Sequence, residues 1–198
     1  MTALERSEID RRRLLRAAGA SALVAIAGCA GDDGDDAEGE SDDEEDADPE
    51  SVDVPEDATW RTASLVDVST DEEFRIADLD RPAVVHTFAR GCAVCHAQQR
   101  EFGEFYATAE GDVEIVDLTI DPNDDPDEIR EYAEEDDFGW RFGTSPEPVT
   151  GSLVDSFGQD VTVSAASPVV LVCPDGEVYS LEKVVDGDQL ESILAEVC

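Results

Sequence analysis

Basic residues are scarce in this sequence. Its 198 residues include 13 lysines and arginines against 51 aspartates and glutamates, which gives a formal net charge of −38 at pH 7. Lysine occurs once, as Lys183. A surface with this excess of negative charge repels nucleic acid and anionic lipid, so neither is expected as a charge-driven partner.

Methionine, histidine and long apolar runs are scarce as well. Met1 is the only methionine, and His86 and His96 are the only histidines. These side chains are the common second axial ligands of a haem c. The apolar run at residues 17–27 is shorter than the about 20 residues that a transmembrane helix needs. The sequence therefore offers few haem ligands and no comfortable membrane span.

What the sequence does contain is a Cys-x-x-Cys motif, Cys92-Ala93-Val94-Cys95, between two apolar segments. The β-branched run Ala83–Phe88 predicts a buried strand, and Ala93–Thr108 is rich in helix formers. Two cysteines at i and i+3, where a strand turns into a helix, are typical of thiol–disulfide exchange. A thiolate at Cys92 would lie at the positive end of the helix dipole, which lowers its pKa and makes it a nucleophile.

The same residues, 92–96, also spell C-x-x-C-H, the attachment pattern of haem c, so the motif alone does not decide. A haem c commonly takes a second Met or His ligand. Met1 falls in a segment that we expect to be removed, and His86 lies inside the expected strand. Haem c is therefore the weaker interpretation. A static cysteine pair is weaker again, because a CxxC that opens a helix is seldom inert.

The N-terminus has the pattern of an export signal. Arg11-Arg12-Arg13 precedes the apolar run, and the paired arginines resemble a twin-arginine signal. Ile26-Ala27-Gly28-Cys29 resembles a lipobox, whose cysteine becomes lipidated after cleavage. We predict a twin-arginine lipoprotein signal peptide at residues 1–29, lipidation at Cys29, and a location on the extracytoplasmic face of the cell membrane. An uncleaved anchor and a soluble secreted protein are the alternatives.

The next segment, residues 30–58, holds sixteen acidic residues and no basic ones. Such a segment cannot bury enough surface to order itself, so we predict a disordered acidic tether, followed by one domain at residues 59–198. The acidic excess, with arginine favoured over lysine, resembles proteins of salt-loving archaea. High salt would screen the self-repulsion, since the Debye length falls to about 3 Å at 1 M.

Strand and helix patterns alternate along the domain. We expect strands at residues 60–68, 73–79, 83–88, 113–120, 169–172 and 178–184, and helices at residues 93–108, 124–137, 146–157 and 190–197. The first two strands would form a hairpin around Ser69-Thr70-Asp71, and Asp175-Gly176 would turn between the last two. The pattern predicts an α/β domain with a mixed central sheet flanked by helices.

Two cysteines remain after lipidation and the CxxC are assigned. Cys173 and Cys198 form an even remainder, which is consistent with a structural disulfide in an oxidising compartment. Two unpaired thiols are the alternative, because the sequence cannot test the Cα separation that a disulfide demands.

Several segments resemble the thioredoxin-like superfamily. Residues 86–95 are similar to the strand and CxxC of thioredoxins and of the TlpA/ResA family, and residues 167–178 look like their cis-proline strand and hairpin. Residues 117–122 and 140–144 resemble the insertion of the Sco and TlpA/ResA branches. The resemblance covers roughly residues 60–198. It implies a thioredoxin-like fold with an N-terminal β-hairpin and a Sco/TlpA-type insertion.

The resemblance also implies roles for single residues. Cys92 would be the exposed nucleophile, Cys95 the buried resolving thiol, and Pro168 the cis-proline that faces the disulfide. His86 falls where thioredoxins keep a buried acid, so it could accept the proton of Cys95, or be a core histidine without a catalytic part. His96 is expected to face solvent.

The activity that the resemblance implies is that of a membrane-anchored extracytoplasmic thiol–disulfide oxidoreductase without a cofactor. Its partners would be extracytoplasmic proteins with disulfides or dithiols, and a membrane thiol carrier would resupply electrons. The alternative is a Sco-like copper-binding assembly factor for a respiratory oxidase, because two thiolates suit Cu(I). Sco proteins, however, space the cysteines by three residues and place a histidine where this chain has Ala165-Ala166-Ser167.

Overall fold

The computed structural model describes residues 48–198 apart from residue 110 and residues 183–184. The expected signal peptide, Cys29, the tether up to residue 47 and Lys183 lie outside the described residues. Within the described part of the chain, no helix combines the length and the apolar character that crossing a bilayer requires.

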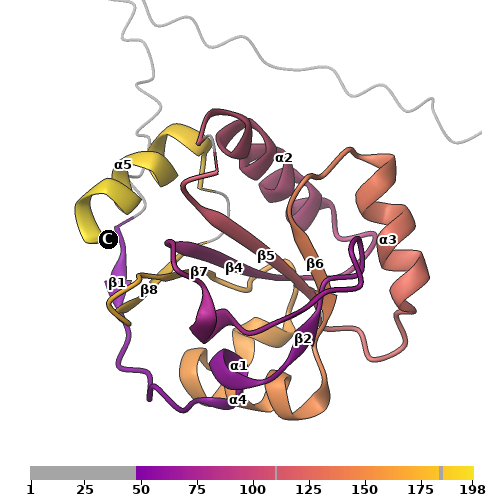
Figure 1. Ribbon diagram of the computed structural model, residues 1–198, viewed down its shortest axis with the longest axis horizontal. Helices are drawn as coiled ribbons and strands as arrows, with labels where there is room; N and C mark the ends of the chain where they lie inside the picture. The colour runs from indigo at the N-terminus through magenta and orange to yellow at the C-terminus, as the bar shows by residue number, and fades with distance from the viewer. Residues whose placement is uncertain (1–47, 110, 183–184) are drawn as a thin grey trace, which may run out of the picture. The chain divides into compact units, whose positions relative to one another are not determined.

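A six-stranded mixed sheet forms the centre of the domain, in the order β1-β8-β7-β4-β5-β6 (Figure 1). Strands β4, β5 and β6 run parallel, whereas β7 is antiparallel to β4, β8 to β7, and β1 to β8. The strands are β1 (Glu50–Ser51), β4 (Ala83–Phe88), β5 (Glu114–Thr119), β6 (Arg141–Thr144), β7 (Val169–Val172) and β8 (Val178–Leu181). The predicted mixed central sheet is confirmed.

Helices cover both faces of this sheet (Figure 1). One face carries α2 (Ala93–Thr108), α3 (Pro126–Glu135) and α5 (Gly187–Val197), and the other carries α1 (Thr59–Thr62) and α4 (Glu147–Phe157). Side chains alternate along β4, so Val84 and Phe88 pack with α2, while Val85 packs on the opposite side. All six residues of β4 are buried, which explains why apolar residues on it point to both faces of the sheet.

The N-terminal hairpin forms, but it is shorter than expected. Strands β2 (Leu65–Val66) and β3 (Glu73–Phe74) pair antiparallel in a separate small sheet. Residues 60–62, expected in a strand, belong instead to α1, and Ile76–Asp78 is a 3-10 helix (η1). Trp60 explains the change: it is fully buried, its ring lies 5.6 Å from that of Phe157, and its Nε1 donates to Ser156 Oγ at 3.1 Å.

The end of the expected acidic tether is also ordered. Residues 50–51 form β1, which pairs with the outer edge of β8. The Val52 N–H donates to the Val178 carbonyl at 2.8 Å, and Val52 and Val54 pack against the core under α1 and α4. The prediction that disorder extends to residue 58 is therefore wrong, because two valines and a free strand edge are enough to order this segment.

The remaining elements follow the expected pattern with small differences. Asp125 caps α3, its side chain accepting from the Asp127 N–H at 2.9 Å. Gly158 closes α4 at a positive φ of 82°. The strand β6 was not expected, and its Gly143 lies against the Val66 carbonyl, where a Cβ would approach to 3.1 Å.

A disulfide joins Cys173, directly after β7, to Cys198, directly after α5, with the Cα atoms 5.2 Å apart. It pins the end of the terminal helix to the sheet. Cys173 lies at the end of the sheet where β4 begins, since Val172 pairs with Ala83. This bond is therefore remote from the cysteines that follow β4.

Candidate active site

Cys92 and Cys95 lie at the N-terminus of α2 and form a disulfide with Cα atoms 5.3 Å apart. Cys92 is the N-cap of the helix, and its Sγ accepts from the Cys95 N–H at 3.2 Å. Cys92 is half-buried, whereas Cys95 has no exposed surface. A partner can therefore reach Cys92 but not Cys95. After reduction, the helix dipole and this N–H would stabilise a thiolate at Cys92.

Gly91 and Arg90 determine the conformation of the turn before Cys92. Gly91 has a φ of 78°, a left-handed conformation that glycine adopts without strain. The Arg90 guanidinium donates to Asp124 Oδ1 at 2.9 Å and to Glu128 Oε2 at 2.8 Å, which ties the turn to the start of α3. The hydrogen bond to Asp124 raises the pKa of Arg90.

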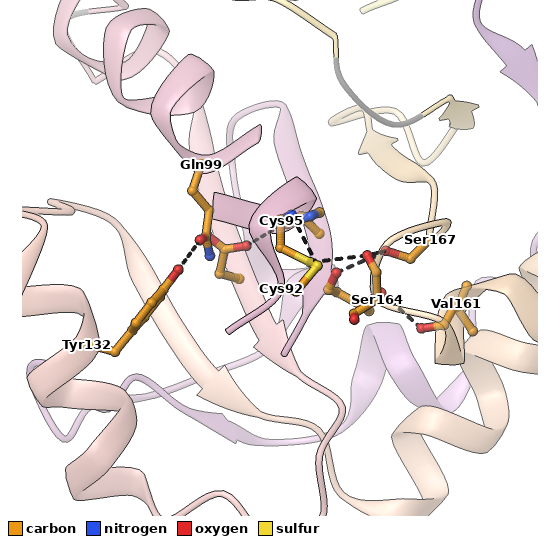
Figure 2. The surroundings of a disulfide bond; sticks show 10 residues. Cys92, Cys95, Gln99, Tyr132, Val161, Ser164 and Ser167 are labelled. Atoms are coloured by element: carbon orange, nitrogen blue, oxygen red, sulfur yellow. Dashed lines mark hydrogen bonds and ion pairs between the residues drawn. A yellow bond between two sulfur atoms is a disulfide. The ribbon is translucent and has the colours of Figure 1, made fainter. Parts of the chain in front are cut away.

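The loop before β7 lies against the cysteine pair (Figure 2). The Cys95 Sγ is 3.1 Å from the Ser164 carbonyl. Ser167 Oγ donates to the Thr87 carbonyl at 2.9 Å, and Thr87 Oγ1 donates to the Val161 carbonyl at 3.0 Å, so the loop is fastened to the end of β4. In the reduced protein the Ser164 carbonyl can accept the S–H of Cys95, which favours the protonated form of Cys95 and leaves Cys92 as the thiolate.

The expectation of a cis-proline at Pro168 is wrong. No peptide bond between described residues is cis, so the Ser167–Pro168 bond is trans. The trans form is intrinsically favoured by about 0.5–1 kcal/mol. Pro168 instead stands directly before β7, a position that proline tolerates in a sheet. The backbone group that contacts Cys95 is the Ser164 carbonyl, in the loop before the proline.

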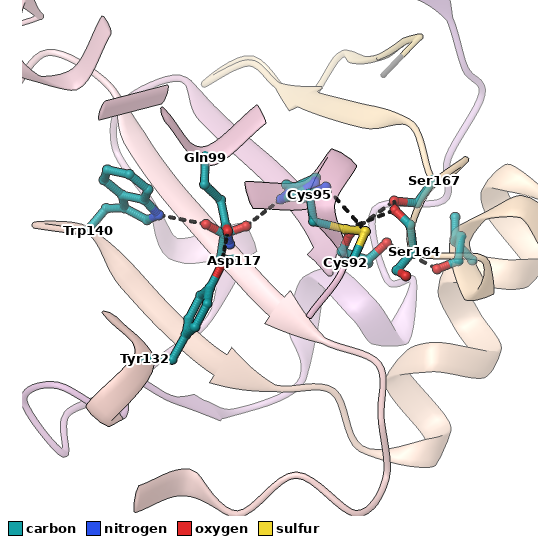
Figure 3. Close-up of polar contacts among 11 residues, drawn as sticks. Cys92, Cys95, Gln99, Asp117, Tyr132, Trp140, Ser164 and Ser167 are labelled. Atoms are coloured by element: carbon teal, nitrogen blue, oxygen red, sulfur yellow. Dashed lines mark hydrogen bonds and ion pairs between the residues drawn. A yellow bond between two sulfur atoms is a disulfide. The ribbon is translucent and has the colours of Figure 1, made fainter. Parts of the chain in front are cut away.

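Beneath α2, two ionisable side chains meet without exposed surface. His86 on β4 pairs in register with Asp117 on β5, and His86 Nδ1 lies 2.5 Å from Asp117 Oδ1. The Trp140 Nε1 donates to the other carboxylate oxygen, Oδ2, at 2.7 Å (Figure 3). The sequence interpretation included His86 but missed Asp117 and Trp140. A single acid, Asp117, within the largely apolar pattern of residues 115–120 was the available signal.

Three solved structures have this arrangement of sheet and helices. A secreted disulfide oxidoreductase of Mycobacterium tuberculosis, homologous to Escherichia coli DsbE, is 15% identical over 70% of this chain and 98% of its own, with a TM-score of 0.54. The thioredoxin domain of a thiol–disulfide oxidoreductase from Bacteroides vulgatus is 17% identical over 67% of this chain and 90% of its own (TM-score 0.52). The fold is thioredoxin-like.

A third structure with the thioredoxin-like fold is a SCO1/SenC family lipoprotein from Bacillus anthracis str. Ames. It is 18% identical over 75% of this chain and 94% of its own, with a TM-score of 0.54. No protein-family model and no curated protein matches the sequence. At these identities the comparisons establish the fold, and the chemistry has to be argued from the site itself.

In this thioredoxin-like domain, α3 and the residues after it wall the site with aromatic rings. Tyr132 on α3 donates to Gln99 Oε1 on α2 (Figures 2 and 3). Burial raises the pKa of Tyr132, and the charges of Asp117 and Asp136 add to that shift. His96 lies at the surface, where its Nε2 is 3.1 Å from Asp136 Oδ2. Its side chain is 39% exposed, in line with the solvent-facing position expected for it.

The residues present do not fit a Sco-type copper site or a haem c. Among the described residues, no group of three or more His, Cys, Asp and Glu side chains is placed to hold a metal. Residues 165–167 supply no histidine to the cysteine pair. A thioether to haem would need Cys95 to face a haem pocket, but its Sγ is buried against the Ser164 carbonyl.

Proposed function

We propose that the protein is a membrane-anchored extracytoplasmic thiol–disulfide oxidoreductase that works through Cys92 and Cys95. The observation that carries the proposal is the unequal exposure of the two sulfurs at a helix N-terminus, with Cys92 reachable and Cys95 buried. One cysteine can then attack a partner while the other stays in place to release it. The thioredoxin-like fold supports the proposal.

The chemistry follows from this geometry. In the reducing direction, the Cys92 thiolate attacks one sulfur of a partner disulfide, the partner S–S bond breaks, and a mixed disulfide forms. Cys95 then loses its proton and attacks the Cys92 Sγ, so that the partner leaves as its second thiolate. The Cys92–Cys95 disulfide remains, and two electrons have moved to the partner. The oxidising direction is the same sequence reversed.

The surface beside Cys92 suits an uncharged stretch of a partner protein. Val94, between the two cysteines, is 37% exposed, and Val163, in the loop that contacts Cys95, is 52% exposed. Three large apolar side chains are exposed in the described part of the chain, and these are two of them.

The location is argued from the sequence. Residues 1–29 have a twin-arginine signal pattern, Cys29 would carry the lipid, and the acidic residues 30–47 would hold the domain away from the membrane. An integral membrane thiol carrier would supply or remove the electrons. Fractionation of cells that express the full chain tests the anchor: Cys29→Ser should move the protein from the membrane to the medium. Unchanged membrane association of that variant would contradict a lipid anchor at Cys29.

Exchange with a disulfide-bonded protein substrate tests the activity. Cys92→Ser should abolish exchange, while Cys95→Ser should accumulate mixed disulfides that are visible on a non-reducing gel. The matched control is the double variant Cys173→Ser/Cys198→Ser, which should exchange at the wild-type rate. Full activity in Cys92→Ser would end the proposal. Stoichiometric copper in anaerobically purified protein would favour the Sco-like alternative instead.

A further inference from the structure

The buried pair of His86 and Asp117 is more than a satisfied core contact, because its position relates it to Cys95. A buried carboxylate is costly unless it is paired and hydrogen-bonded. Both oxygens of Asp117 are engaged, one by His86 Nδ1 at 2.5 Å and one by Trp140 Nε1 at 2.7 Å. These contacts satisfy both carboxylate oxygens of Asp117 in the interior, next to an imidazole.

The imidazole lies under the face of α2 that carries Cys95. The ring of His86 meets that of Phe102 edge-on, with centroids 5.5 Å apart. Cys95 precedes Phe102 by seven residues, which is two helical turns, so the two side chains share one face of the helix. Both are fully buried in the same apolar cluster. In the view of Figure 3, Asp117 lies between the indole of Trp140 and the cysteine pair.

We propose that Asp117 is a positioning residue for proton transfer in the resolving step, with Trp140 fixing Asp117. A neutral imidazole donates from one nitrogen and accepts at the other. With Nδ1–H donated to Asp117, Nε2 of His86 is the basic nitrogen and takes the proton of the Cys95 thiol. The electron pair stays on Cys95 Sγ, which attacks Cys92 Sγ, and the proton passes to the departing partner thiolate. The inference rests on the proposed function.

The groups that face the imidazole come from the two neighbouring strands and from α2. Asp117 pairs with it from β5 and Phe102 meets its ring from α2, whereas the residue paired with it on β7 is the apolar Val169. Tyr132 of α3 interacts with Asp117, but burial raises the pKa of Tyr132, so it stays neutral near physiological pH. The negative charge of Asp117 stabilises the imidazolium that forms during transfer.

Single-turnover reaction with a small aromatic disulfide separates the two steps. The first coloured thiol reports attack by Cys92, and the second reports resolution by Cys95. Asp117→Asn has nearly the shape of the native side chain, but its amide N–H can donate to His86 Nδ1 and so shifts the ring proton to Nε2. The second release near neutral pH should slow by about 10²-fold. The loss should vanish at high pH, where the Cys95 thiol ionises without a base.

Two further variants distinguish proton transfer from a packing role. Trp140→Phe keeps an aromatic ring but removes the donor to Asp117, so the carboxylate holds the His86 proton more tightly. The midpoint of the second-release pH profile should move to higher pH, with no change in the first release. His86→Gln should slow resolution as much as Asp117→Asn, and the double variant should add no further loss.

The outcomes separate the inference from the function on which it rests. A wild-type pH profile of the second release in Asp117→Asn would overturn the role of Asp117. If Asp117→Asn does not fold, Trp140→Phe decides, and an unmoved midpoint in that variant overturns the proposal. If instead Cys92→Ser still gives the first release at the wild-type rate, the proposed oxidoreductase function fails, whatever Asp117 does.

Discussion

Gln98 offers the sharpest test of how the redox helix is anchored. It has no exposed surface, and its side-chain amide meets the backbone of Val185 twice. Nε2 donates to the Val185 carbonyl at 2.8 Å, and the Val185 N–H donates to Oε1 at 2.9 Å. The side chain thus satisfies the backbone N–H and carbonyl of Val185, which directly precedes the N-cap of α5.

The substitution Gln98→Met keeps the length and most of the volume of the side chain but removes both hydrogen bonds. Each backbone group of the buried Val185 left unsatisfied costs about 1–3 kcal/mol. The free energy of unfolding should therefore fall by about 2–6 kcal/mol, with little contribution from packing.

Equilibrium unfolding in denaturant at high salt measures this change. The control is Gln159→Met, at an exposed position after α4, which should stay within about 0.5 kcal/mol of the wild type. A loss for Gln98→Met no larger than that of the control would refute the reasoning, because it would mean that the two hydrogen bonds contribute no net stability. An unchanged m-value would show that the denatured state is the same in both proteins.

Three further predictions concern the Cys173–Cys198 disulfide, the N-terminal strand and the net charge. The double variant Cys173→Ser/Cys198→Ser opens a loop with a sequence separation of 25, so the free energy of unfolding in denaturant should fall by about 3 kcal/mol; an unchanged midpoint would contradict this. A chain that begins at residue 59 loses β1, Val52 and Val54, and should unfold about 2 kcal/mol more easily than one that begins at residue 48; equal stabilities would show that β1 contributes nothing. The net charge of −38 should make folding depend on salt, and identical melting curves in dilute buffer and molar KCl would contradict that.

The sequence was sufficient for the parts of the fold that short-range patterns encode. β4 and β7 are buried on both sides and are rich in apolar, β-branched residues, so their bounds were predicted to the residue. The position of the CxxC at a strand-to-helix turn was equally local.

What the sequence could not show depends on contacts between distant segments. Trp60 makes α1 helical through Phe157, nearly a hundred residues later. β1 forms because β8 offers a free edge. Val52 and Val54, which follow β1 and pack against the core, lie in an acidic stretch of sequence that predicted disorder. The pairing of Asp117 with His86 needed the register of β4 against β5, and the role of Trp140 needed the path of the chain after α3.

Two sets of charged and polar groups act on the site: the exposed carboxylates of the surface, and the groups close to the cysteine pair. Salt affects these two sets differently. A net charge of −38 opposes any thiolate on the surface, since like charge disfavours ionisation. Salt screens those exposed carboxylates, but it hardly reaches Asp117 and His86, which have no exposed surface. In molar salt we therefore expect nearby groups to govern the ionisation of Cys92 and Cys95, in particular the N-terminus of α2 and the Ser164 carbonyl. A chain with this surface can keep an ordinary thiol nucleophile because the groups that set its pKa are the ones that salt does not screen.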